Sequence, residues 1–201
     1  KGEEIEVGFD ASLLDNNLGL EVTYYSSRTK DALISVPVPA SSGWVGTVLR
    51  NIGEIANSGL EVAIFGSPIR TPSLTWDATL TLSTNSNEVI SLGEGARDTI
   101  PVGYRNSQRH VAGYPLAGYW TQVPVRNADG SLVFDADGLV VYEDNMKYIG
   151  PSAPTREASL TNTFTLLDGN LQFYVFMDYK GGHYLFNMAR QTAHLDGVSY
   201  E

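Results

Sequence analysis

The sequence predicts an all-β protein folded as an antiparallel meander, and three observations lead to that prediction. Apolar and polar residues alternate with a period of two over six segments of about ten residues, as in strands with one apolar face. Short connections alternate with long ones along the chain. No segment has a convincing helical period. The 201 residues include no cysteine, so neither disulfides nor cysteine-ligated zinc supports the fold.

The six expected strands follow from the alternation. In chain order they are residues 4–13, 18–28, 59–66, 74–84, 158–167 and 171–180. The most regular is 74–84, where apolar side chains at even positions alternate with threonine, serine and aspartate. Each segment therefore has one apolar face and one face that is mainly polar or small.

The connections between these strands favour a membrane barrel. Residues 14–17, 67–73 and 168–170 are expected to be short connections, whereas residues 29–58 and 85–157 are expected to be long loops. Outer-membrane β-barrels have short periplasmic turns and long extracellular loops, while compact soluble domains rarely hold long loops. Because a transmembrane barrel needs at least about eight strands, six strands are interpreted as an arc of a larger barrel. The alternatives are a soluble sheet packed on one side, and further strands within the long loops.

The two faces of the expected strands differ in what they can contact. Glu21, Glu61 and Asp77 lie on the polar face, where they would line a wet lumen, because carboxylates are costly in hydrocarbon. The aliphatic and aromatic face then meets lipid. Trp76 near a short turn and Tyr24 near a long loop fit the aromatic belts of a membrane protein.

Composition argues against a nucleic-acid partner and a helical membrane span. The chain has 13 Lys and Arg against 23 Asp and Glu, a net charge of −10, whereas phosphate binding needs a basic surface. No apolar run approaches the ~18 residues of a spanning helix. Because the chain begins at Lys1 with no initiator methionine and no signal-like segment, we expect a processed chain or a piece of one.

Four groups of motifs occur in order along the chain. They are RNIGEIANSGLE at 50–61, WD at 76–77 with TNSNEV at 84–89, GYPL at 113–116 with GYW at 118–120, and IGPSAP at 149–154 followed by KGG at 180–182. Together they resemble the SusC/RagA-type TonB-linked outer-membrane receptors, with a departure at Pro151 or Ser152, where that family has asparagine. The resemblance implies that residues 1–201 are a single segment from the C-terminal part of a 22-stranded barrel, without its plug domain.

The same resemblance implies a function. It indicates TonB-dependent import of glycans or peptides across the outer membrane of a Gram-negative bacterium, with this chain forming barrel wall and extracellular loops. Implied partners are a SusD-like surface lipoprotein, membrane lipid, and the TonB complex, which would be reached through an N-terminal part missing from this sequence. The alternative is a surface β-rich binding or assembly module without transport.

Candidate contact residues lie in the second long loop. They are Arg105, Arg109, His110, Tyr114, Tyr119 and Trp120. Arginine and aromatic side chains suit stacking on sugars, pairing with acidic or peptide ligands, or contact with a lid protein. The alternative for each residue is that it only packs the loops together.

An acidic segment, DADGLVVYED at 135–144, resembles the calcium-loop-like segment of the family. It makes Asp135, Asp137 and Asp144 candidate Ca²⁺ ligands, because hard oxygen ligands around a glycine turn suit this ion. The first ligand position falls on Val133, however, and a plain β-hairpin fits the segment as well.

The sequence predicts no catalytic residue, because the histidines lack metal-pair spacing and no G-x-S-x-G elbow occurs. We therefore expect a protein that is not an enzyme.

Overall fold

A computed structural model describes the chain except for residues 39–40, 42, 44–45, 52, 94–97 and 196–201. Its main feature is a six-stranded sheet whose strands pair in chain order. The strands are β1 (Gly2–Leu13), β2 (Leu18–Lys30), β5 (Glu54–Arg70), β6 (Leu74–Ser91), β11 (Arg156–Leu166) and β12 (Leu171–Gly181). Every pairing is antiparallel, so the predicted meander is confirmed.

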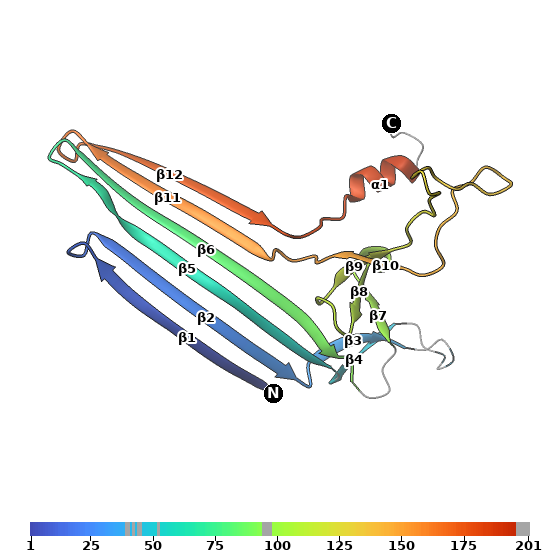
Figure 1. Ribbon diagram of the computed structural model, residues 1–201. Coiled ribbons are helices and arrows are strands. Elements are labelled where there is room, and N and C mark those ends of the chain that lie inside the picture. Colours follow the sequence, from blue (N-terminus) through green and yellow to red (C-terminus); the bar gives the residue numbers. More distant parts are fainter. Residues whose placement is uncertain (39–40, 42, 44–45, 52, 94–97, 196–201) are drawn as a thin grey trace.

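Figure 1 shows this sheet as one layer, with the short turns together at one end and the other elements beyond the opposite end. β5 and β6 extend well past the segments expected from alternation, to Glu54 and Ser91 at the far end. The reason is that apolar alternation marks only the part of a strand that has an apolar face. Beyond that part the hydrogen-bonded ladder continues through polar pairs such as Asn57 with Asn87 and Ser58 with Ser86.

The register places apolar side chains in rows across one face of the sheet. The row at the short-turn end is Ile69, Trp76, Phe164 and Phe173, and a middle row is Ala11, Leu20, Ile64, Leu80, Leu160 and Met177. The last row begins with Val7, Tyr24 and Leu60 and ends in the polar residues Thr84 and Arg156. From Trp76 to Thr84 the rows span about 27 Å along the strand, or about 20 Å along the membrane normal at a tilt of about 40°. This belt therefore has nearly the height that a bilayer requires.

No second layer of protein covers the belt in the part of the chain that the structure describes. Phe173, Val175 and Met177 are exposed on β12. Asn162 is a buried polar residue within the rows, and its Oδ1 accepts a hydrogen bond of 3.1 Å from Trp76 Nε1. The Trp76 ring also stacks on Phe164, with ring centroids 5.8 Å apart. Asn162, a polar side chain that would be costly next to lipid, thus accepts a hydrogen bond from an aromatic donor at the edge of the belt.

The two segments expected as long loops contain further strands. The first carries a hairpin of β3 (Leu33–Pro37) and β4 (Thr47–Asn51). The second carries a four-stranded sheet in the order β10-β9-β8-β7, made of β7 (Thr99–Val102), β8 (Gln108–Val111), β9 (Gly118–Thr121) and β10 (Lys147–Gly150). These strands of four or five residues are too short to show a clear period of two, which is why the alternation did not predict them.

A small core joins these loop elements to the main sheet. Val89 at the end of β6 is fully buried with Leu92 and Ile100. Leu116 packs against this cluster from the loop side. The cluster fixes where the four-stranded sheet sits relative to the end of β6.

The expectation that no helix occurs is wrong at the C-terminal side of β12. Helix α1 (Met188–Leu195) follows it, and Asn187 caps the helix by accepting the Arg190 amide on its Oδ1 at 2.9 Å. Two turns are too short for a helical period to stand out from the sequence. In the described part of the chain, no helix has the length and apolar character needed to cross a membrane.

Candidate functional site

The four-stranded sheet is tied to β6 through a pair of asparagines. Asn87 donates from Nδ2 to Asn57 Oδ1 at 2.7 Å, and Asn87 Oδ1 accepts the Leu116 amide at 2.6 Å. Next to this pair, Val89 exchanges two backbone hydrogen bonds with the segment Gly113–Tyr114, of 2.8 and 2.9 Å. The loop segment therefore pairs, almost as an extra strand, with the edge of β6 that β11 leaves free beyond Thr84, which positions the sheet at the long-loop end of the main strands (Figure 1).

Three aromatic rings hold the sheet together. Tyr114 packs edge-on against Trp120 with centroids 4.8 Å apart, and Tyr148 of β10 lies 5.0 Å from Tyr114 and 5.5 Å from Trp120. Burial, together with the neighbouring Tyr114 and Tyr184 phenols, raises the pKa of Tyr148 above its ordinary value. The Tyr148 phenol therefore stays neutral over the physiological pH range.

An open hollow of about 380 Å³ lies beside this cluster. Its lining combines side chains from residues 105–107, from β9, from β10 and the residue just before it, from the segment between β12 and α1, and from α1 itself. They include Arg105, Tyr119, Trp120, Tyr184, Phe186 and Gln191. Aromatic faces next to one guanidinium and one amide can stack on sugar rings or peptide side chains while pairing with a carboxylate or hydroxyl. This hollow is our candidate functional site.

Arg105 is displayed by an unusual backbone conformation. It lies in a single 3₁₀ turn, Tyr104–Asn106, with φ 52° and ψ 30°. Its guanidinium lies over the Tyr104 ring, 5.6 Å from the ring centroid. The centroids of the Tyr104 and Phe186 rings are 6.0 Å apart. The turn therefore holds the cation at the border of the hollow.

The other predicted contact residues do not line the hollow. Arg109 donates from Nη1 to Thr99 Oγ1 at 3.3 Å, within the sheet. His110 Nδ1 accepts the Ala117 amide at 3.0 Å, and burial lowers the pKa of its imidazole. Tyr114 belongs to the aromatic cluster. For these three residues the structure places the side chain in loop packing, the alternative considered for each.

Some lining residues were missed by sequence reasoning. Met146, Ile149, Tyr184, Phe186 and Gln191 come from segments around β10 and after β12. The run Tyr184-Leu185-Phe186 was the available signal, because three large apolar residues in a tail need a surface to pack on. Tyr184 does so by covering Gly150, where an added Cβ would lie 2.3 Å from the ring.

The acidic segment folds as part of a small module with an eight-residue repeat. NADG at 127–130 and DADG at 135–138 form its two turns. Val125, Val133 and Val141 are joined in a ring of backbone hydrogen bonds of 2.8 to 3.0 Å, each donating to the next. The three extended pieces of this module therefore close on one another.

The hypothesis of a calcium site finds no ligand cluster in the described residues, where no group of three or more His, Asp or Glu side chains is placed to hold a metal ion. Asp135 Oδ1 instead accepts the amides of Asp137 and Leu139, each at 2.9 Å. Asp129 Oδ1 likewise accepts the Ser131 amide and hydroxyl, which lowers the pKa of its carboxyl. These carboxylates shape turns, which is the hairpin alternative.

A single antiparallel layer with an uncovered apolar belt, short turns at one end and elaborated loops at the other defines the wall of a large transmembrane β-barrel. Comparison with known proteins agrees. The family model for the β-barrel of TonB-dependent receptor-like proteins matches residues 1–200. The chain therefore belongs to the TonB-dependent receptor β-barrel family, whose barrels lie in the outer membrane of Gram-negative bacteria and are transporters rather than enzymes.

Named relatives fall within the same family. The chain is 36% identical to TonB-dependent receptor P3 of Formosa agariphila over 46% of this chain and 9% of the relative. It is 28% identical to TonB-dependent receptor SusC of Bacteroides thetaiotaomicron over 71% of this chain and 16% of the relative. A solved RagAB peptide transporter superposes with a TM-score of 0.76 at 21% identity, over 94% of this chain and 22% of that one. The chain thus spans a minor part of the length of the proteins it matches.

Proposed function

We propose that this chain forms part of the wall and extracellular loops of a receptor that actively imports nutrient oligomers, glycans or peptides, across the outer membrane. The observation that carries the proposal is the hollow at the long-loop end, which combines Arg105 with aromatic faces. That end is extracellular in outer-membrane barrels, where an incoming ligand is first met. The solved RagAB structures that the chain resembles are of a peptide importer, which supports import of an oligomeric nutrient.

Uptake by the full-length receptor tests this proposal. A panel of labelled oligosaccharides and peptides is offered to cells that carry the receptor or its Arg105→Ala variant. Loss of a charge-assisted contact should lower binding of carboxylate-bearing ligands by about tenfold. Arg50→Ala is the matched control, because Arg50 is exposed on β4 and does not line the hollow.

Dissipating the proton gradient separates transport from binding. Import by a TonB-dependent receptor should stop while surface binding persists. If binding persists and no energy-dependent uptake occurs before the gradient is dissipated, the alternative of a surface binding or assembly module is correct. If Arg105→Ala and Arg50→Ala have equal effects, the hollow is not the ligand contact.

We further propose that a SusD-like surface lipoprotein covers the long-loop end, and that the TonB complex acts on parts of the receptor outside this chain. In support, Phe134, Leu139 and Tyr142 are exposed on the eight-residue-repeat module. Exposed apolar side chains on a projecting module favour a protein contact. Affinity purification of the tagged receptor from membranes should recover a lipoprotein in equal amount, and replacing all three residues by serine should reduce that recovery. Recovery unchanged by the triple substitution would exclude these contacts.

A further inference from the structure

The outer edge of β1 is unpaired among the residues that the structure describes. β1 pairs only with β2, so its other edge presents backbone N–H and C=O groups without a strand partner. On the lipid-facing side Val7 and Phe9 are exposed, whereas Glu6, Gly8 and Asp10 alternate with them on the lumen-facing side. A strand that pairs with this edge therefore needs apolar side chains on one face and a complement to two carboxylates on the other.

The register sets like charges next to each other on the lumen-facing side. Asp10 on β1 is the direct cross-strand partner of Glu21 on β2. Glu61 on β5 is diagonal to Glu21, because Glu21 pairs with Ala63 and Glu61 pairs with Thr23. Like charges directly opposite each other destabilise an antiparallel pair. No lysine or arginine of the described chain lies within 4.0 Å of these three carboxylates, so their charge is not balanced within this sheet.

A smaller hollow of about 300 Å³ lies beside these carboxylates, and we call it the lumen hollow. Glu21, Glu61 and Thr23 line it together with hydroxyl side chains of β6. Toward the edge of the sheet, the register partner of Thr23 is Gly8, which adds no side chain to the surface. Along this one row, the surface between the outer edge of β1 and the lumen hollow is therefore clear of bulky side chains.

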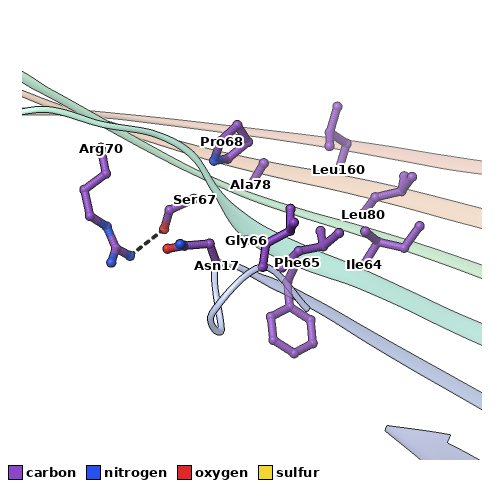
Figure 2. A pocket seen from close by; sticks show the side chains of 12 residues that line it. Asn17, Ile64, Phe65, Gly66, Ser67, Pro68, Arg70, Ala78, Leu80 and Leu160 are labelled. Atoms are coloured by element: carbon purple, nitrogen blue, oxygen red, sulfur yellow. Dashed lines mark hydrogen bonds between the residues drawn. The ribbon is translucent and has the colours of Figure 1, made fainter. Parts of the chain in front are cut away.

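Two other lumen-facing glycines of the sheet are covered by a long side chain from the neighbouring strand. Phe65 of β5 lies over Gly19 of β2, and Tyr25 of β2 lies over Gly59 of β5, so an added Cβ would meet a ring at either glycine. Figure 2 shows the Phe65 ring pointing away from the apolar side chains of the lipid-facing side. Gly8 has no such cover from β2, where its partner is a threonine. A long side chain from the strand on the other side of β1 fits this place.

We propose that the strand paired with the outer edge of β1 in the complete receptor carries a lysine or arginine opposite Gly8. Its side chain crosses Gly8 and ends between Asp10 and Glu21, at the border of the lumen hollow. Neighbouring strands lie about 4.8 Å apart, so the long stem of either residue crosses one strand and brings its charge to the carboxylates of β1 and β2. One cation there converts the repulsion between Asp10 and Glu21 into two attractions.

The charges also select which strand this is. The matched relatives are several times longer than this chain, so the same receptor has chain to supply the partner. The alternative is β12 of a second copy, but its only cation, Lys180, is already paired with Glu157 at 3.2 Å. The partner is therefore another strand of the same receptor. The proposal rests on the barrel-wall fold and not on the identity of any imported ligand.

Photocrosslinking in the full-length receptor identifies the partner strand. Glu6 is replaced by the photoreactive amino acid p-benzoylphenylalanine, and crosslinked peptides from irradiated membranes are mapped by mass spectrometry. We expect a peptide of the same receptor outside residues 1–201, with alternating apolar residues and a lysine or arginine at a lumen-facing position. The same amino acid at Thr79, on the interior strand β6, is the control and should not capture this peptide. A peptide of β12, a peptide of another protein, or a partner strand without a lumen-facing cation would overturn the proposal.

The double variant Asp10→Asn with Glu21→Gln tests the charge balance. With a cation between the two carboxylates, their removal leaves it unpaired, and the equilibrium constant for urea unfolding in lipid vesicles should rise by about three- to tenfold. Asp15→Asn with Asp168→Asn is the matched control, because it removes the same charge from exposed turns outside the sheet. Without a cation, the double variant relieves a repulsion and is at least as stable as the native receptor, which contradicts the proposal.

Salt separates a charge effect from a packing effect in the same variants. The difference between the native receptor and the double variant should shrink in about 1 M salt, because exposed ion pairs are screened. A difference that persists in full at that salt concentration, or an equal loss of stability in the control, would also overturn the proposal. Heat-modifiable mobility in gels verifies that each variant is folded.

Discussion

Asn87 connects the wall to the loops through two hydrogen bonds of one side chain, to Asn57 and to the Leu116 amide. Asn87→Ala leaves both partners unsatisfied in a partly buried place, which should lower the local opening free energy by about 1–3 kcal/mol. Hydrogen exchange measured by mass spectrometry should show faster exchange over residues 108–121. Asn127→Ala, which removes only an exposed bond to Ser131, should leave that region unchanged. Equal exchange in the two variants would show that Asn87 is not the anchor.

His110 makes the same region sensitive to acid. Its pKa is lowered by burial, so below the ordinary value of 6.5 the unfolded loop binds more protons than the folded loop. The stability contributed by the neutral imidazole is therefore complete above that pH and falls as the pH drops below it. Titration of His110 by C2-hydrogen exchange should give a pKa below 6.5 in the folded receptor and near 6.5 in urea. A folded value at or above the unfolded one would contradict this account.

For single residues, the sequence identified candidates for contact but not the side chains or backbone groups that they contact. Asn57 and Asn87 lie in the two motifs that resemble the receptor family, yet their contact depends on the β5–β6 register, which no local pattern specifies. Of the predicted contact residues, Arg105, Tyr119 and Trp120 line the hollow, whereas Arg109 and His110 serve the loop backbone and sheet. Composition identifies a loop rich in arginine and aromatic side chains. Only the fold shows which of these side chains line the hollow and which pack the loop elements together.

At the scale of the strands a further prediction follows, because adjacent positions on β6 face different surroundings, lipid for one and the aqueous lumen for the next. Leu80 lies in the middle row of the belt and Thr81 on the polar face, where its Oγ1 contacts Ser159 Oγ at 2.6 Å. Leu80→Lys should cost about 2–4 kcal/mol, the penalty for a cation near the bilayer midplane. Thr81→Lys, one residue away, should cost much less because the lumen is wet. Urea unfolding in lipid vesicles measures both, and equal costs would contradict the assignment of faces.

Alternation predicted the elements only where one side of the strand is apolar. It therefore located the belt portions of all six long strands in the sheet but not their polar extensions, such as residues 85–91 of β6. It could not predict β3, β4 and β7–β10, whose four or five residues show no clear period. Helix α1 was missed for the same reason, since two turns carry too little pattern.

At the scale of the whole molecule, the two edges of the six-stranded sheet support the assignment to a barrel as much as its apolar face does. β1 and β12 each have only one pairing partner in the described structure, and their outer edges are long. Open edges of this kind are satisfied by further strands when a sheet closes into a barrel. The match of a family barrel model to residues 1–200 agrees with open edges of this kind, and the matched relatives are several times longer than this chain.

The central claim is that this chain is part of a membrane-spanning wall, with one face toward lipid and the other toward the water-filled lumen. The absence of native cysteine in the chain allows a direct measurement by single-cysteine substitutions at residues 77–82 of β6 in the full-length receptor, reacted in native membranes with a water-soluble maleimide. We predict labelling at 77, 79 and 81 and protection at 78, 80 and 82. Cysteines at any native sites elsewhere in the receptor are first replaced. Uniform labelling, or protection at all six positions, would contradict the account.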